Sequence, residues 1–188
     1  MTAFATAADL GKRLQRTFTA GAETEWIDEL LADASSYLRG EIGQEIFPST
    51  TSTYTAYPTN GREDLPQHPV VTVDAVVRDS VGIEFTYRPG RITVDCDDPC
   101  DVTFTWGYET APRELTRVAC VLVSQTLITL EAQLGLTAGG LSSAQIDEFR
   151  LAWANAGEQS GMEAPPRLLA SLRRQFGRGD VHVSETDG

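Results

Sequence analysis

The sequence feature that most constrains the fold is the apolar stretch at residues 113–134, RELTRVACVLVSQTLITLEAQL. Its apolar side chains recur at helical spacing and cover most of the helix circumference, so they predict a helix rather than a strand. The apolar positions are Leu115, Val118, Val121, Leu122, Leu127, Ile128 and Leu130. A helix with so wide an apolar surface needs other elements around it. We therefore expect residues 113–134 to be the central and most buried element.

Two amphipathic helices are expected before this stretch. Residues 7–18 place Leu10, Leu14 and Phe18 on one face. Residues 22–42 carry a longer apolar stripe, and their first half is rich in acidic residues, which are favourable at the N-terminal end of a helix dipole. The stripe consists of Trp26, Ile27, Leu30, Leu31, Ala34, Leu38 and Ile42.

Between the second and third helices the hydrophobic period changes to that of strands. Residues 49–60 are rich in Thr and Tyr and predict an extended edge strand or a hairpin arm, and the Val-rich residues 69–82 predict a second strand closed by a turn. A hairpin is expected through Arg88-Pro89-Gly90. Residues 101–106 alternate apolar and polar side chains, as a half-buried strand does. Pro112 then suits the first turn of the next helix, and this junction predicts a sheet edge held against a helix.

The C-terminal part predicts a short basic helix. Residues 166–177 begin with a proline and end with a glycine, which favours a helix between them. One face would carry Leu168, Leu169, Leu172 and Phe176, and arginines would decorate the rest: Arg167, Arg173, Arg174 and Arg178. The preceding residues 141–163 stay open between strand and helix, since their apolar residues alternate whereas Ser142 and Gln145 fit a capping box.

The order of these elements predicts an α+β fold. We expect a small helical bundle of about four helices, with a small antiparallel β module inserted between the second and third main helices, and an extended C-terminal arm. The predicted organisation is a body over residues 1–140 that contains the β module at 49–108, a loop or extended arm over 141–163, and a helix with a polar tail over 164–188.

Composition excludes several classes of function. The formal net charge is −12, and an acidic domain repels nucleic acid. No apolar run approaches the length of a membrane span, and the first residues do not resemble a signal peptide. We therefore expect a chain that is made and kept in a cytoplasm, without a membrane partner.

The sequence also lacks the motifs that carry catalysis. No phosphate-binding loop and no nucleophile elbow are present, and His68 and His182 have no evident partners. A few acids cluster in one turn but lack the calcium-loop spacing, and the three cysteines predict free thiols in a reducing compartment. The acids are Asp95, Asp97, Asp98 and Asp101, and the cysteines are Cys96, Cys100 and Cys120. We expect no enzyme activity, no cofactor and no metal.

The arginine-rich helix is the charge feature open to interpretation. It is either a solvated polar face or a docking element, in which an apolar stripe with an arginine rim fits a groove on an acidic partner. Nucleic-acid binding is a third reading, which the net charge disfavours.

Three stretches, in this order and spacing, resemble one family. They are the helix pair at residues 5–44, the strand pattern that follows Pro69-Val70, and the strand, Gly107-Tyr108 and Pro112 that lead into the apolar helix. The C-terminal LLASLRRQFGRG is a weaker fourth piece. Together they resemble the head-to-tail adaptor (head completion or connector) proteins of long-tailed double-stranded DNA phages.

The resemblance implies a structural protein of the virion neck that is assembled in the host bacterial cytoplasm. It implies a homo-oligomeric ring of about twelve copies that binds the portal protein after DNA packaging. Such a ring extends the DNA channel, encloses double-stranded DNA without sequence-specific binding, and carries the stopper or tail-joining protein. The portal-binding residues would be those of the C-terminal helix: Arg167, Leu168, Leu169, Leu172, Arg173, Arg174, Phe176 and Arg178. The alternatives are a stopper or tail terminator, which we would expect to be mostly β, and a small hydrolase.

Overall fold

A computed structural model describes residues 2–133 and 162–177, with the backbone alone for 129–133. Four helices and seven strands are present in these residues, so the predicted α+β class with antiparallel strands is confirmed. The helices are α1 (Ala7–Leu14), α2 (Ala22–Ile42), α3 (Arg113–Gln133) and α5 (Pro166–Phe176). The strands are β1 (Thr50–Ala56), β2 (Arg62–Asp64), β3 (Val70–Arg78), β4 (Val81–Gly82), β5 (Phe85–Arg88), β6 (Arg91–Val94) and β7 (Cys100–Trp106).

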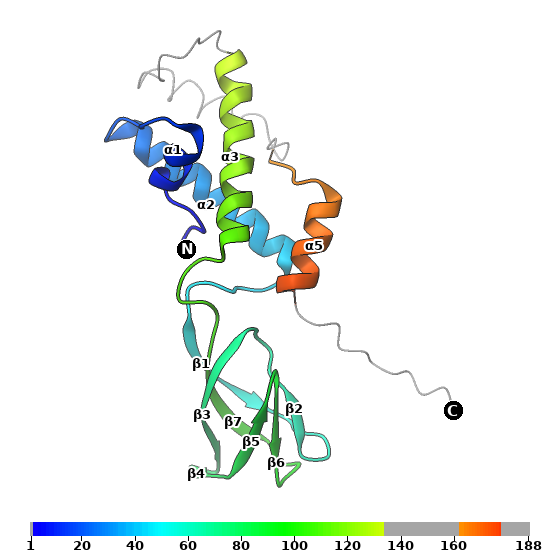
Figure 1. Ribbon diagram of the computed structural model, residues 1–188. Coiled ribbons are helices and arrows are strands. Elements are labelled where there is room, and N and C mark those ends of the chain that lie inside the picture. Colours follow the sequence, from blue (N-terminus) through cyan, green and yellow to red (C-terminus); the bar gives the residue numbers. More distant parts are fainter. Residues whose placement is uncertain (1, 134–161, 178–188) are drawn as a thin grey trace. The chain divides into compact units, whose positions relative to one another are not determined.

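The chain forms two compact units. One combines Met1–Glu41 with Ala111–Leu168, and the other combines Ile42–Thr110 with Leu169–Gly188. The first therefore contains α1, most of α2 and α3, and the second contains both sheets and most of α5 (Figure 1). The sequence-based organisation, with a body over 1–140, stays a prediction. Most of its 141–163 segment, and the tail beyond residue 177, lie outside the described residues.

The helical unit follows the apolar stripes closely. All seven stripe residues of α2 are buried, and α2 ends at Ile42 as expected. α1 ends four residues earlier than expected, because Gln15 adopts a left-handed conformation (φ 53°) that stops the helix at Leu14. Phe18 therefore lies beyond α1, under the Arg16 guanidinium.

α3 is less enclosed than its composition predicts. Leu115, Val118, Leu122 and Leu127 are buried, but Ile128 is 62% exposed. Val121, which is half-buried, lies on the same side of the helix as Arg113, Arg117 and Ile128, since helical positions four, seven and eight apart share a face. The side of α3 that carries Arg113, Arg117 and Ile128 is thus exposed at these three positions and half-buried at Val121 between them.

The second unit packs two sheets around a common core. One sheet has the order β1-β7-β3-β4 and the other has the order β2-β6-β5. The core residues are Ala56, Leu65, Val76, Ile92, Val94, Cys100, Val102, Phe104 and Trp106. The predicted hairpin between β5 and β6 and the predicted edge strand β1 are confirmed. The strand before the helix junction is not at an edge, however, since β7 lies between β1 and β3.

The side chains of β7 alternate between the core and the opposite face of the sheet. Val102, Phe104 and Trp106 enter the core, while Thr103 and Thr105 lie on the other face. There the two threonine hydroxyls bond to Thr53 and Thr51 of β1, both at 2.7 Å. Cross-strand pairs of this kind stabilise a sheet and fix the register of β1.

The Phe104→Ala variant tests this core. Phe104 is 1% exposed and its ring packs edge-on against Tyr54. Truncation should lower the free energy of unfolding by about 3–5 kcal/mol, because it removes buried apolar area and leaves a cavity. Urea denaturation followed by circular dichroism measures this effect. The control Thr103→Ala, on the outer face of the same strand, should lose less than about 1 kcal/mol, and equal losses would contradict the assignment.

Candidate functional site

The C-terminal helix predicted to dock onto a partner divides into an inner and an outer side. Its inner residues Leu169, Leu172 and Phe176 are buried within the chain. Leu168 is half-buried, and the outer arginines Arg167, Arg173 and Arg174 are exposed, whereas Arg178 lies outside the described residues. The structure thus brings seven of the eight predicted site residues together on α5, with only the arginine side open to a partner.

The end of α5 is held by a buried glutamine. The side chain of Gln44 is 7% exposed, and its amide nitrogen donates to the carbonyl of Phe176 at 2.5 Å. Its oxygen accepts from the backbone N–H of His68 at 3.0 Å. The Tyr108 ring meets the Phe176 ring edge-on at 6.3 Å between centroids. These contacts fix the last turn of α5 on the second unit.

His68 lies beside the end of α5 but has no catalytic partner there. It lines a small hollow of about 100 Å³. The hollow is lined by Gln44, Ile46, His68, Pro69, Tyr108, Gln175, Phe176 and Gly177. None of these lining residues carries a carboxylate or a thiol. The carboxylate that interacts electrostatically with His68 is that of Asp64, which accepts two hydrogen bonds from Arg91. His182, the other histidine, lies outside the described residues.

Three of the four acids in the 95–101 turn make contacts within the fold. Asp97 accepts from the backbone N–H of Gly61 at 2.7 Å, and Asp101 accepts from the Thr55 hydroxyl at 2.8 Å. Asp98 pairs with Arg78 at 3.2 Å. In the part of the chain that the structure describes, no three His, Cys, Asp or Glu side chains are grouped to hold a metal ion.

The thiols are unpaired and two of them are shielded from reaction. Cys96, Cys100 and Cys120 are free. Burial raises the pKa of both the Cys100 and the Cys120 thiol, with smaller contributions from nearby charged groups. Because the thiolate is the nucleophile, a raised pKa lowers the reactivity of these two thiols.

None of the described helices is both long and apolar enough to cross a lipid bilayer.

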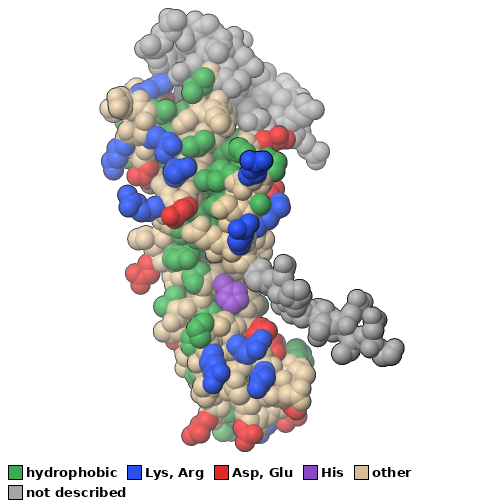
Figure 2. Space-filling model, turned by 45° about the vertical axis from the view of Figure 1, so that its right-hand side comes forward, with side chains coloured by type: hydrophobic (Ala, Val, Ile, Leu, Met, Phe, Trp, Pro, Cys, Tyr) green, Lys and Arg blue, Asp and Glu red, His purple; other side chains and the backbone are tan. Residues whose placement is uncertain are grey.

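A second surface, which sequence reasoning missed, lies between α1 and α3. We define the arginine groove as the open hollow of about 530 Å³ lined by Arg13, Arg113 and Arg117, together with Asp9, Glu114, Thr116 and Cys120. The pair Arg113 and Arg117, one helical turn apart, was a visible signal in the sequence. Arg13 comes from a distant part of the chain, so only the fold brings the three arginines together. Figure 2 shows Lys and Arg side chains both over the helical part and over the β part of this acidic chain.

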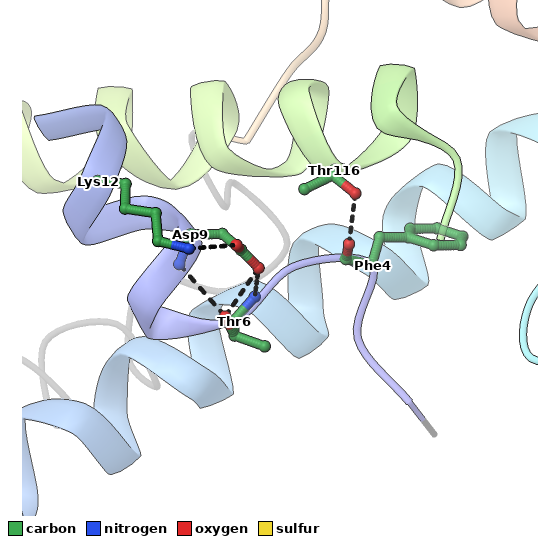
Figure 3. A network of polar contacts seen from close by, with 5 residues as sticks. All are labelled: Phe4, Thr6, Asp9, Lys12 and Thr116. Carbon is green, nitrogen blue, oxygen red and sulfur yellow. Dashed lines mark hydrogen bonds and ion pairs between the residues drawn. The ribbon is translucent and has the colours of Figure 1, made fainter. Parts of the chain in front are cut away.

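The walls of the arginine groove are fixed by the polar contacts drawn in Figure 3. Thr6 caps α1 and exchanges hydrogen bonds with Asp9, which also lies 4.0 Å from the Lys12 ammonium. The Thr116 hydroxyl of α3 donates to the backbone carbonyl of Phe4 at 2.8 Å, just before α1. α1 and α3 are thereby tied together at the end of the groove.

The solvent side of α2 carries the opposite charge. We define the acidic stripe as Glu25, Glu29 and Asp33, which are exposed and lie one helical turn apart. Burial and repulsion from Glu29 raise the pKa of the Asp33 carboxyl. The raised pKa indicates that Asp33 has no dominant cation beside it in the described structure.

Comparisons with known proteins show similarity of fold. No family matches the sequence, and no curated protein is similar to it. A chain in the neck of an empty gene transfer agent particle, computed with C6 symmetry, matches with a TM-score of 0.55 over 97% of this chain and 96% of that chain, at 19% identity. A chain in the virion of a native gene transfer agent particle matches with a TM-score of 0.54 over 93% and 89%, at 18% identity. At these identities, the comparisons show a similar fold and no more.

The Gln44→Ala variant tests how α5 is held. Without the amide, the buried Phe176 carbonyl and the His68 N–H lose their partner, which costs about 1–3 kcal/mol. Hydrogen exchange of the backbone of α5 should accelerate. The control Gln175→Ala removes an exposed glutamine from α5 itself and should leave the exchange unchanged. Equal protection in both variants would show that Gln44 does not hold the helix.

The Glu29→Gln variant tests the electrostatics of the acidic stripe. Removing the neighbouring negative charge should lower the pKa of Asp33 toward its ordinary value, leaving the contribution of burial. Carboxyl chemical shifts followed through a pH titration by NMR measure this change. Glu25→Gln is the matched control, because Glu25 does not act on Asp33. A pKa of Asp33 that does not move in Glu29→Gln would contradict the assigned cause.

Proposed function

We propose that this chain is a structural protein of the neck of a phage-like particle, where it acts as a head-to-tail adaptor. It binds the portal after DNA packaging, extends the DNA channel and provides the platform for the stopper or tail. The observation that carries the proposal is the match of fold to a neck chain over 97% of this chain and 96% of the other. A match over nearly the whole of both chains supports equivalent architecture, helices and β module together, rather than one shared motif.

The proposed assembly is a homo-oligomeric ring of about twelve copies in the virion neck, put together in the host bacterial cytoplasm. The sixfold symmetry of the similar neck is compatible with this number. A structural role also agrees with Asp97, Asp98 and Asp101, whose carboxylates make contacts within the fold.

The acidity of the chain suits a ring that encloses DNA. A net charge of −12 for each copy gives a strongly acidic ring. Binding to the phosphate backbone is driven by the release of counterions, and an acidic wall offers none of that gain. In this proposal acidic side chains line the channel, so that double-stranded DNA passes without sequence-specific binding and without adhering.

The portal-binding surface in this proposal is α5. The buried Leu169, Leu172 and Phe176 hold the helix on the chain, so that the exposed arginines are presented to portal carboxylates or carbonyls. Arg167, Arg173 and Arg174 provide the described part of this charge, and Arg178 would extend it. Rigid presentation lowers the entropy lost on binding.

Sedimentation of the chain with purified portal rings, followed by electron microscopy of the complex, tests the proposed function. A second ring stacked on the portal is the expected result. If no complex forms at micromolar concentration with intact portal rings, the adaptor role fails, and a stopper or tail terminator becomes the function to test.

Charge reversal on α5 tests the docking surface. Arg167→Glu with Arg174→Glu should weaken binding to portal rings at least about tenfold, because like charges then face each other. The matched control is Arg62→Glu with Arg88→Glu, which reverses two exposed arginines in the β module and should bind normally. Binding by both double variants at the wild-type level would remove α5 from the docking surface.

A further inference from the structure

The arginine groove presents cationic groups that make no direct contact with a carboxylate among the described residues. The guanidinium groups of Arg13, Arg113 and Arg117 form no hydrogen bond or ion pair with any described residue. Of the two acids in the groove, Asp9 is engaged by Thr6 and Lys12. Three arginines from two helices therefore converge on an open hollow with a net positive charge, within a chain of net charge −12.

The surface beside the groove is apolar, which favours a protein partner. The side of α3 that carries Arg113 and Arg117 continues to the half-buried Val121 and to Ile128, which is 62% exposed. Exposed large apolar side chains next to arginines are typical of protein–protein contacts, where arginine is enriched at the interface. A phosphate backbone would gain nothing from Ile128.

The acidic stripe on α2 has the complementary pattern. Glu25 and Glu29 are one helical turn apart, about 6 Å along the axis, and so are Arg113 and Arg117. The same exposed side of α2 continues beyond the acids to Ser36 and Gly40, whose small size allows close approach of a neighbouring helix. On α2, acidic residues are followed by small residues, and on α3, arginines are followed by apolar residues. The two surfaces are therefore complementary in charge and in size.

We propose that the arginine groove of one copy of this chain binds the acidic stripe on α2 of a second copy. This contact rests on the proposed function, since it is the contact between neighbours in the proposed ring. The two surfaces differ, so the contact is head-to-tail, and a repeated head-to-tail contact closes into a ring when its rotation allows. Ile128 of one copy approaches the small residues of α2 of the next.

Two charge-reversed variants of the full chain test the proposal. The first carries Arg113→Glu and Arg117→Glu, and the second carries Glu25→Arg and Glu29→Arg. In the first both surfaces are acidic, and in the second both surfaces are basic. We expect the wild-type chain to self-associate in sedimentation velocity at concentrations up to about 1 mM. Each variant alone should stay monomeric, and their equimolar mixture should associate, because each groove again faces the opposite charge.

The controls separate charge from folding. Arg62→Glu with Arg88→Glu changes the net charge by the same amount as the groove variant and should self-associate like the wild type. Glutamates near the N-terminus of α3 are favourable to the helix dipole, so the groove variant should keep its circular dichroism spectrum and melting temperature. Raising the salt concentration should weaken wild-type association, since exposed charges are screened.

The proposal is overturned by any of three results: the wild type fails to self-associate, the groove variant associates like the wild type, or the mixture does not recover association. A groove variant that loses only its binding to a fluorescent duplex DNA probe would assign the arginine groove to nucleic acid instead. If the groove variant still stacks as a ring on portal rings, the adaptor function stands and this contact is wrong. If no variant and no wild type binds the portal, the adaptor function itself fails.

Discussion

The helical unit depends on the two backbone hydrogen bonds of one residue near the N-terminus. The N–H of Phe4 donates to the Ser35 hydroxyl of α2 at 2.9 Å, and its carbonyl accepts from Thr116 of α3 at 2.8 Å. The ring of Phe4 is buried and lies 4.5 Å from the guanidinium of Arg39, which also donates to the Thr2 carbonyl. Because the two backbone groups of Phe4 are satisfied by different helices, displacing this segment would leave both of them without these partners. The position of α1, and with it of Arg13, follows from this clamp.

The periodicity of apolar residues predicts which face of a single helix or strand is buried. It does not predict surfaces that residues from several elements form together. The apolar stripe of α2 and the alternation of β7 could be predicted from the sequence. In the helix every third or fourth residue packs against the core, and in the strand every second residue does. The interior place of β7 was not readable, since the strand pattern does not say how many neighbours bond to it. The end of α1 depends on the φ of Gln15, a local conformation that residue type does not fix. The apolar count of α3 also overestimated its burial at Ile128.

The same reasoning applies to the candidate surfaces. The arginines of α5 were found in sequence because they are adjacent in it, whereas the arginine groove needed the approach of α1 to α3. A net charge of −12 also hides how charge is distributed, since acids on α2 and arginines in the groove cancel in any sum. The positions of oppositely charged patches on the helical unit indicate self-association better than the net charge of the chain does. Complementary patches specify both the partner and its orientation.

The composition of the basic residues has a practical consequence at the arginine groove. Lys12 is the one lysine in the sequence, and its side chain is 82% exposed on α1, next to Arg13. Apart from the α-amino group, reagents directed at amines consequently have a single side chain to modify, in the helix that forms one wall of the groove. A fluorophore attached there reports on the environment of that wall in intact protein, without any engineered cysteine and without touching Cys96, Cys100 or Cys120.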